Sequence, residues 1–342
     1  MMAVTNEELW EEESKNRKNL WRLAFFIILP VFLVLLFLSA WLTQPFVLST
    51  GSTESQIKVD PNELETHIRK LSDELYPRNY LNLQNLNASA DYIKTEFQKT
   101  GGKVSEQIFT VNGSDYKNIC LELGEESIDR IVIGAHYDSA NMTHGADDNA
   151  SGIAGLLELA RAFAAKPPAA KIELVAFSLE EPPFFGSEQM GSFVHARSLK
   201  ERGVHVKLMV CLEMIGYFSD EPNSQAFPLS IGRLLYPTTG NFIAIVGNFS
   251  NIGTIRAFKS GMRATTSLPI YSINAPSFVT GVDFSDHRNY WQVGYDAIMI
   301  TDSAFYRNKN YHTVDDTYEK IDYVRMAEVV NATYSAVVNA SK

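Results

Sequence analysis

One strand-like apolar segment ends in residues that can bind a metal ion. Residues 131–135 are β-branched or small, and the chain then continues as HYDS, which supplies His136 and Asp138. A polar loop leads to a second acidic pair, Asp147 and Asp148, where a helix is expected to begin. Unpaired charge at the edge of a hydrophobic core is costly, and a bound metal is a common way to compensate it. The segment therefore predicts that further metal ligands follow later in the chain.

Other predicted strands also end in metal-binding residue types. Glu180 and Glu181 follow one strand, Glu213 follows the next, and His312 lies in the loop after another. Ligand sites of open α/β sheets lie beyond the carboxyl ends of the strands, so these side chains are expected near His136. Two imidazoles and several carboxylates suit Zn²⁺, but five ligands exceed the needs of one tetrahedral ion. A carboxylate shared by two ions about 3.5–4 Å apart would use all five.

The elements that must position these residues alternate along the chain. Strands are expected at 106–111, 116–123, 130–135, 171–179, 206–212, 242–247, 268–273 and 297–301. Helices are expected at 61–75, 87–100, 151–165, 186–202, 250–259, 285–292 and 323–339, with a long loop or hairpin at 216–241. This alternation predicts an α/β fold with a mixed, mostly parallel central sheet and helices on both faces.

The N-terminal part of the chain has the composition of a membrane anchor. Residues 1–22 are a polar tail with several Lys and Arg residues, and residues 23–42 carry no charge. A helix of that length matches the bilayer core, so a transmembrane signal anchor is expected there. Residues 43–60 form a linker, and residues 61–342 the catalytic domain. The positive-inside rule leaves the N-terminus in the cytoplasm and the domain outside it, periplasmic or extracellular. The alternative is a cleaved signal peptide and a secreted protein.

The overall composition limits the possible partners. The chain has 342 residues, a formal net charge of −10 and a pI near 5.3, which argue against nucleic acid or an anionic membrane surface. Cys120 and Cys211 lie in apolar runs and are interpreted as small buried side chains, although a disulfide is conceivable in an oxidising compartment.

An ordered set of motifs makes the sequence similar to a known family. HYDS, GADDNASG, LEEPPFFGSEQMGS, CLEMIGY, FSDHRNYW and YHTVDDTYEKID occur in this order. The set resembles the co-catalytic zinc exopeptidases of metallopeptidase family twenty-eight, which includes secreted bacterial leucyl aminopeptidases. The resemblance extends from about Leu86 to the C-terminus, and the ordered set is far more specific than any single motif.

The resemblance implies a role for each candidate ligand. His136 and Glu213 would bind one zinc ion, Glu181 and His312 the other, and Asp148 would bridge both. Many family members have aspartate at the position of Glu213, so its mode of binding is open. By position, Asp147 is the alternative to Asp148 as the bridging residue.

The resemblance also implies the residues that support catalysis. Glu180 would be the general base that activates a metal-bridging water. Asp138 would orient His136 through the far ring nitrogen. A cis peptide is implied between Asp148 and Asn149.

Several other polar residues are expected outside the metal site. His144, His195 and His205 are interpreted as surface or loop residues. Asp286 is expected either to cap a helix or to contact substrate. Asp315 and Asp316 are expected to brace the loop that carries His312, but that pair is not assigned to the metals.

Three kinds of function remain possible from the sequence. The favoured one is a membrane-anchored, di-zinc aminopeptidase that acts on peptides. A carboxypeptidase, with Arg288 or Arg307 binding the substrate carboxylate, and a glutaminyl-cyclase-like enzyme are alternatives on the same fold. The cyclases of this clan use one zinc ion, so five intact ligands favour a peptidase. A non-enzymatic ectodomain is the third possibility, and the oligomeric state is left open.

Overall fold

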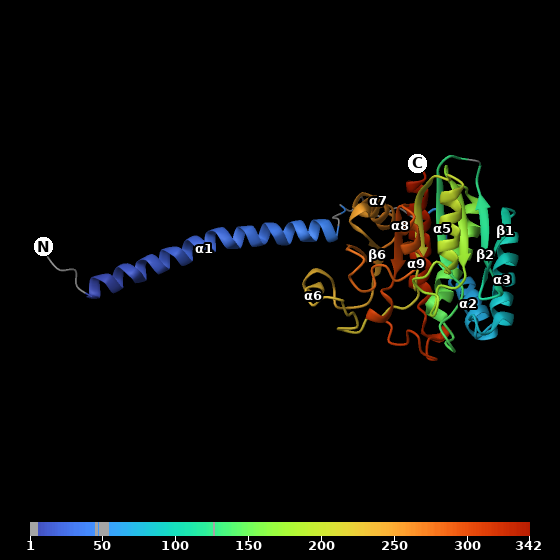
Figure 1. Ribbon diagram of the computed structural model, residues 1–342, viewed down its shortest axis with the longest axis horizontal. Coiled ribbons are helices and arrows are strands. Elements are labelled where there is room, and N and C mark those ends of the chain that lie inside the picture. The colour runs from blue at the N-terminus through green and yellow to red at the C-terminus, as the bar shows by residue number, and fades with distance from the viewer. Residues whose placement is uncertain (1–5, 45–46, 48–54, 126) are drawn as a thin grey trace.

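A long N-terminal helix projects from an α/β domain in the computed structural model (Figure 1). The structure describes residues 6–44, 47, 55–125 and 127–342. Part of the N-terminal tail and part of the expected linker, residues 1–5, 45–46 and 48–54, lie outside the described residues, as does residue 126.

The domain is built on one eight-stranded sheet that contains all the expected strands. The strands are β1 (Lys103–Val111), β2 (Ser114–Leu123), β3 (Arg130–His136), β4 (Lys171–Phe177), β5 (Val206–Leu212), β6 (Ile243–Gly247), β7 (Ile270–Asn274) and β8 (Ala297–Thr301). Their order is β1-β2-β4-β3-β5-β8-β6-β7. The predicted mixed, mostly parallel sheet is therefore confirmed.

The four central strands give the sheet one edge at which polar loops meet. Strands β4, β3, β5 and β8 run parallel to one another. The pairs β1–β2, β2–β4 and β6–β8 are antiparallel, and β6 and β7 are parallel to each other. Strands β3 and β4 are buried along their whole length, as expected for parallel strands covered on both faces. The carboxyl ends of the four parallel strands lie together, and we call this edge the carboxyl rim.

Helices cover both faces of the sheet. The helices are α2 (Pro61–Arg69), α3 (Leu83–Gln98), α4 (Gly152–Ala165), α5 (Gly191–Glu201), α6 (Gly232–Leu235), α7 (Ile252–Arg263), α8 (His287–Gln292) and α9 (Tyr323–Ala340). Helices α2, α3, α4, α7 and α9 pack together on one face, and α5 and α8 pack on the other. Each layer has its own buried apolar cluster against the sheet. Asp60 caps α2 by accepting a hydrogen bond from the Asn62 N–H at 2.9 Å.

The N-terminal helix α1 (Asn6–Thr43) is long and apolar enough to cross a membrane. Its candidate span, residues 10–43, is not buried against the domain. Pro30 lies inside the helix without ending it. These features suit either an anchor or a signal sequence.

Some local expectations differ from the structure. Helix α5 begins at Gly191 rather than at residue 186, because residues 182–190 form a series of turns after the cis bond between Pro182 and Pro183. His195 was expected at the surface, and this is wrong, since its side chain is buried between α5 and the sheet. Both cysteines are buried, as their apolar surroundings indicate, and neither forms a disulfide.

Candidate metal centre

The predicted ligands converge at the carboxyl rim from five segments of the chain. His136 is the last residue of β3, and Glu213 directly follows β5. Glu181 lies in the loop after β4, and His312 lies in the loop after β8. Asp148 comes from the short helical turn η2 (Ala146–Ser151) that precedes α4. The structure therefore brings together all five residues that the sequence singled out.

Asp148 lies between the two histidines. Its Oδ1 is 3.3 Å from Nε2 of His136, and its Oδ2 is 3.1 Å from Nε2 of His312. Each ring nitrogen also faces one glutamate: Glu213 Oε2 lies 3.3 Å from His136, and Glu181 Oε2 lies 3.1 Å from His312. The donors thus form two groups that share one carboxylate, each with its ligand atoms close enough to hold a cation.

Several buried atoms of this cluster have no hydrogen-bond partner. Nε2 of His136, Nε2 of His312 and Oε1 of Glu181 are all in this state. Buried polar atoms are normally hydrogen-bonded, so unpartnered ring nitrogens that point at carboxylates fit the donor set of a cation site. Two imidazole groups and three carboxylate groups, one of them shared, fit two zinc ions.

The backbone around Asp148 is fixed by the carboxylate of Asp316. This carboxylate accepts hydrogen bonds from the N–H groups of Asp147 and Asp148 at 3.1 and 3.0 Å. The peptide between Asp148 and Asn149 is cis, as the family resemblance implied. Asn149 donates to the Leu212 carbonyl at 2.9 Å, which ties the turn to the end of β5.

Asp147 points away from the two histidines. Its Oδ1 accepts the Gly216 N–H at 3.1 Å, and its Oδ2 accepts a hydrogen bond from Asn308 Nδ2 at 2.9 Å. Both oxygens are therefore engaged in holding loops together. Of the two adjacent aspartates, the geometry selects Asp148 as the residue that can join the two donor groups.

Asp138 organises the loop that carries the two glutamates. Its carboxylate accepts the N–H of Glu180 at 3.2 Å and that of Glu181 at 3.1 Å. Its backbone carbonyl lies 3.1 Å from Nδ1 of His136, whereas its own carboxylate is 3.6 Å from that nitrogen. Residue 138 thus orients His136 mainly through the main chain, and its side chain positions the acidic pair.

Glu180 lies beside the two donor groups. Its Oε2 is 3.9 Å from Nε2 of His136, farther than the oxygens of Asp148 and Glu213. Burial raises the pKa of Glu180 well above its ordinary value, although the nearby His136 opposes this shift. A buried carboxyl group at this distance is suited to proton transfer.

The pKa shifts of the cluster reflect its excess of carboxylates over histidines. Burial, followed by the charge of Asp148, raises the pKa of Glu181 to about 7. Burial opposes protonation of His312, but the adjacent carboxylates of Asp148 and Glu181 raise its pKa to about 10. Burial would also raise the pKa of Asp148, yet its two histidine partners lower it. Without other cations, protons have to compensate these carboxylates, and two divalent ions would replace them.

Two supporting residues were missed or misjudged from the sequence. Ser285 donates to Oε2 of Glu213 at 2.7 Å and thereby orients this carboxylate. Asp286 is buried at the start of α8, but its side chain does not cap the helix. The motif FSDHRNYW contains both residues, but its sequence alone does not show which of them faces Glu213.

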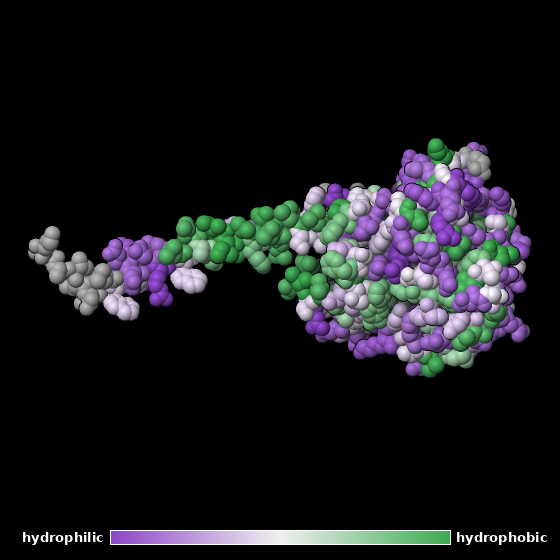
Figure 2. Space-filling model, in the orientation of Figure 1, coloured by the Kyte–Doolittle hydropathy of each residue, from purple (hydrophilic) through white to green (hydrophobic). Residues whose placement is uncertain are grey.

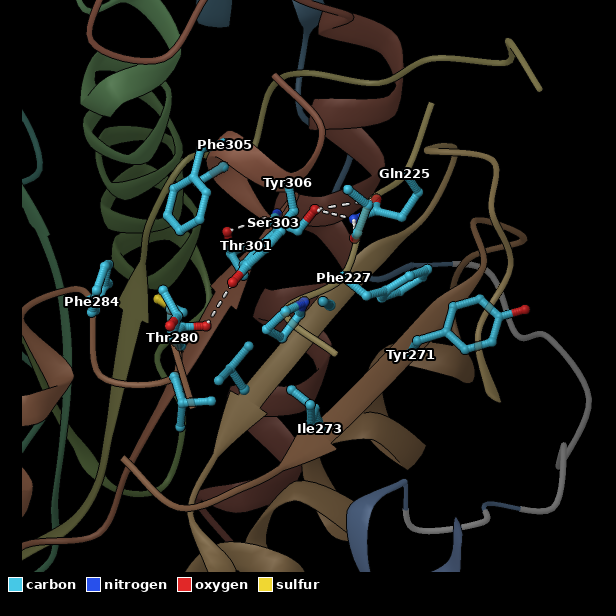
Figure 3. Close-up of a pocket in the computed structure, with 18 of the residues that line it drawn as sticks. Gln225, Phe227, Tyr271, Ile273, Thr280, Phe284, Thr301, Ser303, Phe305 and Tyr306 are labelled. Carbon is cyan, nitrogen blue, oxygen red and sulfur yellow. Dashed lines mark hydrogen bonds between the residues drawn. The ribbon is translucent and has the colours of Figure 1, made fainter. Parts of the chain in front are cut away.

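An apolar cavity adjoins the cluster (Figure 3). It lies over strands β6, β7 and β8 under the loops that carry Phe227, Phe284 and Phe305. Glu213 and Tyr311 line it at the metal end. The Tyr311 ring also stacks on the His312 ring, with centroids 3.8 Å apart.

Comparison with known proteins agrees with this geometry. Residues 118–337 match the model of peptidase family M28, and the chain belongs to this family. Members of this family typically bind zinc, and the buried His, Asp and Glu groups supply suitable ligands.

The relatives of the chain include an uncharacterized protein and a leucine aminopeptidase. The chain is 46% identical to the uncharacterized protein YfbL of Escherichia coli K12, over 92% of this chain and 98% of that protein. It is 23% identical to leucine aminopeptidase 1 of Grosmannia clavigera, over 80% of this chain and 66% of the relative.

Solved structures show the same fold. A leucine aminopeptidase precursor from Bacteroides thetaiotaomicron matches with a TM-score of 0.60 and 19% identity, over 84% of this chain and 98% of that one. The glutaminyl cyclase of Fimbriiglobus ruber matches with a TM-score of 0.63 and 18% identity, over 86% and 99%. At this level of identity these structures show the fold alone.

Proposed function

We propose that the chain is a membrane-anchored, two-zinc aminopeptidase. The observation that carries this proposal is the position of Asp148, whose two oxygens face two different histidines at 3.3 and 3.1 Å. A structural zinc site would use four ligands around one ion. A carboxylate shared by two donor groups is the arrangement of a two-metal hydrolase.

Each zinc ion would have its own histidine and glutamate. His136 and Glu213 would hold one ion, His312 and Glu181 the other, and Asp148 both. When bound, such a pair lowers the pKa of water and polarises the peptide carbonyl.

Glu180 is proposed as the general base and acid. As a carboxylate it would accept a proton from the attacking water and then donate it to the amine that leaves. Burial, which raises its pKa, makes the ionised group a stronger base. Asp138 keeps Glu180 in place through the backbone N–H group, and the surrounding burial excludes bulk water from the proton transfer.

The surroundings of the cluster favour a substrate with a free amino terminus. The apolar cavity beside Glu213 can accept a large apolar side chain. Of the two arginines that could bind a substrate carboxylate, Arg307 is buried and donates to Gln225 at 2.9 Å. Arg288 pairs with Asp283 at 3.7 Å.

Helix α1 is proposed to remain as an uncleaved anchor. Lys15, Arg17, Lys18 and Arg22 precede the apolar span, so the N-terminus would be cytoplasmic and the domain extracytoplasmic. The intact mass of the protein purified from membranes tests this point, because signal cleavage would remove the span.

The activity is tested with matched peptides on the zinc-loaded full chain. A peptide with an N-terminal leucine should lose that residue, and its N-acetylated form should remain intact. Shortening of the acetylated peptide from its C-terminus would assign a carboxypeptidase instead. Release of ammonia from an N-terminal glutaminyl peptide, without shortening, would assign a cyclase.

A further inference from the structure

The negative charge of the chain is unevenly distributed. Between Glu221 and Asp283 there is no acidic residue, although the whole chain has a formal net charge of −10. The basic residues of this stretch are Arg233, Arg256, Lys259 and Arg263. The net charge argued against an anionic surface as a partner for the whole chain, but that argument does not apply to residues 222–282.

These residues form the part of the domain next to helix α1. They contain α6, β6, α7 and β7, and β7 is the edge strand of the sheet. Asn274 at the end of β7 donates to the Leu42 carbonyl at 3.2 Å, and Gln44 donates to the Leu235 carbonyl at 3.3 Å. In Figure 1 this edge faces α1, and β1 lies at the far side of the domain. We call residues 222–282 the anchor-side face.

An interfacial aromatic side chain marks where the helix reaches this face. The guanidinium of Arg256 on α7 lies 5.0 Å from the centroid of the Trp41 ring. Tryptophan is enriched at the boundary between hydrocarbon and headgroups. If Trp41 lies at that boundary, the anchor-side face lies within reach of the headgroups.

The loop around α6 exposes apolar side chains on the anchor-side face. Leu229, Ile231 and Leu234 are 58%, 51% and 82% exposed, and Arg233 is exposed among them. Figure 2 shows a hydrophobic group at the position of α6, beside the end of α1. An apolar group with an adjacent cation is the composition of a segment that binds the membrane interface.

We propose that residues 229–235 dock on the outer surface of the bilayer that α1 spans. Leu229, Ile231 and Leu234 enter the headgroup region, and Arg233 contacts anionic phospholipid headgroups. The occupant is a lipid surface because the apolar group is continuous with the end of the span and no acidic residue of this stretch repels phosphate. This inference rests on the proposed membrane anchor, but not on the peptidase chemistry.

Docking would also set the position of the substrate cavity. Phe227 and Tyr236 flank the docking segment on either side, and both line the apolar cavity. The cavity would then lie one short loop away from the bilayer surface. Peptides attached to that surface would reach the site without release into solution.

The test uses nitroxide labels on the full chain in vesicles of phosphatidylcholine and phosphatidylglycerol. Leu234→Cys carries the test label. Ile108→Cys, at a 63% exposed position on the far strand β1, is the matched control, and Leu35→Cys on α1 reports the anchor. The two native cysteines are buried and stay unlabelled. Collision rates with oxygen and with a water-soluble nickel chelate give the depth of each label.

The expected result is a several-fold higher ratio of oxygen to nickel collisions at 234 than at 108. An aqueous label at 234 with a bilayer label at 35 would overturn the docking while leaving the anchor intact. Aqueous labels at both 234 and 35 would overturn the anchor, and the docking with it. A 234 label that is aqueous in vesicles but immobilised in native membranes would assign the segment to a protein partner instead of lipid.

Arg233→Glu tests the contribution of the headgroups. In the same vesicles, the ratio of oxygen to nickel collisions at the 234 label should fall several-fold in this variant, because the label moves toward water. Lys103→Glu on β1, where the side chain is 77% exposed, is the matched charge reversal and should leave the label in place. Equal depth in Arg233→Glu and the unmodified chain would contradict the contact with anionic headgroups.

Discussion

Two buried clusters among the described residues contain metal-binding residue types, but they differ in how their charges are compensated. The rim cluster consists of His136, Asp148, Glu180, Glu181, Glu213 and His312. The sheet cluster consists of Cys120 on β2, Glu173 on β4 and His195 on α5. By composition and distance alone, either could hold a metal ion.

The sheet cluster is already neutralised by the protein. Glu173 pairs with Arg130 at 2.7 Å and with His195 at 3.3 Å. Nδ1 of His195 lies 2.7 Å from the Tyr290 hydroxyl, within hydrogen-bond distance. Burial alone would raise the pKa of Glu173, but His195 and Arg130 lower it to about 2. Burial raises the pKa of Cys120, so this residue remains a thiol and a poor ligand.

The rim cluster has no comparable compensation among its own residues. Its carboxylates outnumber its histidines, and Nε2 of both histidines lacks a hydrogen-bond partner. Unpartnered donor atoms and uncompensated charge therefore identify a metal site better than the residue types do.

The largest expected effect is on turnover in Glu180→Gln. The variant cannot accept a proton, so hydrolysis should fall roughly 10²- to 10⁴-fold while both zinc ions remain bound. Steady-state rates on an N-terminal leucine peptide, together with the zinc content, measure this. Glu173→Gln is the matched change in the sheet cluster, and its folded fraction should turn over at the normal rate. Unchanged turnover in Glu180→Gln would remove the proposed base.

Glu173→Gln should instead destabilise the fold. It leaves Arg130 without its closest carboxylate in the sheet core, and breaking such a buried pair costs about 3 kcal/mol of unfolding free energy. Urea unfolding of the full chain in detergent measures this loss. Glu188→Gln, which affects an exposed pair with Arg197, is the control and should have no measurable effect. Equal stability of both variants would show that the sheet cluster is not a structural ion pair.

Asp138→Asn should weaken metal binding without removing a ligand. The amide can accept hydrogen bonds through only one oxygen, so one of the N–H groups of Glu180 and Glu181 loses its partner. Loss of such outer support typically lowers metal affinity about 10- to 100-fold. Competition with a zinc chelator measures the affinity. An affinity equal to that of the unmodified chain would show that this carboxylate does not position the acidic pair.

The smallest expected effect is a pH dependence of the metal-free protein. The pKa of Glu181 is raised to about 7 in the folded state, so the proton on this group stabilises the fold. That contribution is complete below the ordinary pKa near 4.5 and is lost as the pH rises through 7. The Tm of the metal-free chain should therefore fall between pH 5 and pH 8 by roughly a few degrees.

Two controls assign this pH dependence to the rim. Glu181→Gln should make the fall in Tm shallower. Asp286 and Asp316, with pKa values raised by burial to about 7, contribute in the same direction. His312 does so as well, because its pKa of about 10 in the folded state is above the ordinary value of 6.5. Added zinc should raise the Tm more at pH 8 than at pH 5, because metal binding displaces protons. A fall that is equally steep in Glu181→Gln would assign the effect to those other groups.

Much of the fold was predictable because its signals are local. Strand β3 is an apolar run that ends in His136, and β5 is one that Glu213 directly follows. Parallel strands direct such residues to one rim. The strand order is not a local property. The insertion of β8 between β5 and β6, which helps bring the His312 loop to the rim, follows from long-range packing.

The supporting contacts were less predictable. Asp316 holds Asp148 across a long sequence separation, and the periodicity of α5 does not show that His195 meets Glu173. The charge of the anchor-side face was visible in the sequence, but its meaning depended on where α1 ends.

Zinc stoichiometry tests the central claim most directly. The full chain, stripped of metal, reloaded with zinc and desalted, should bind two ions per molecule by elemental analysis. Glu173→Gln should also bind two, and His312→Ala should bind no more than one. Retention of two ions in His312→Ala, or loss of zinc in folded Glu173→Gln, would contradict the assignment of both ions to the rim cluster.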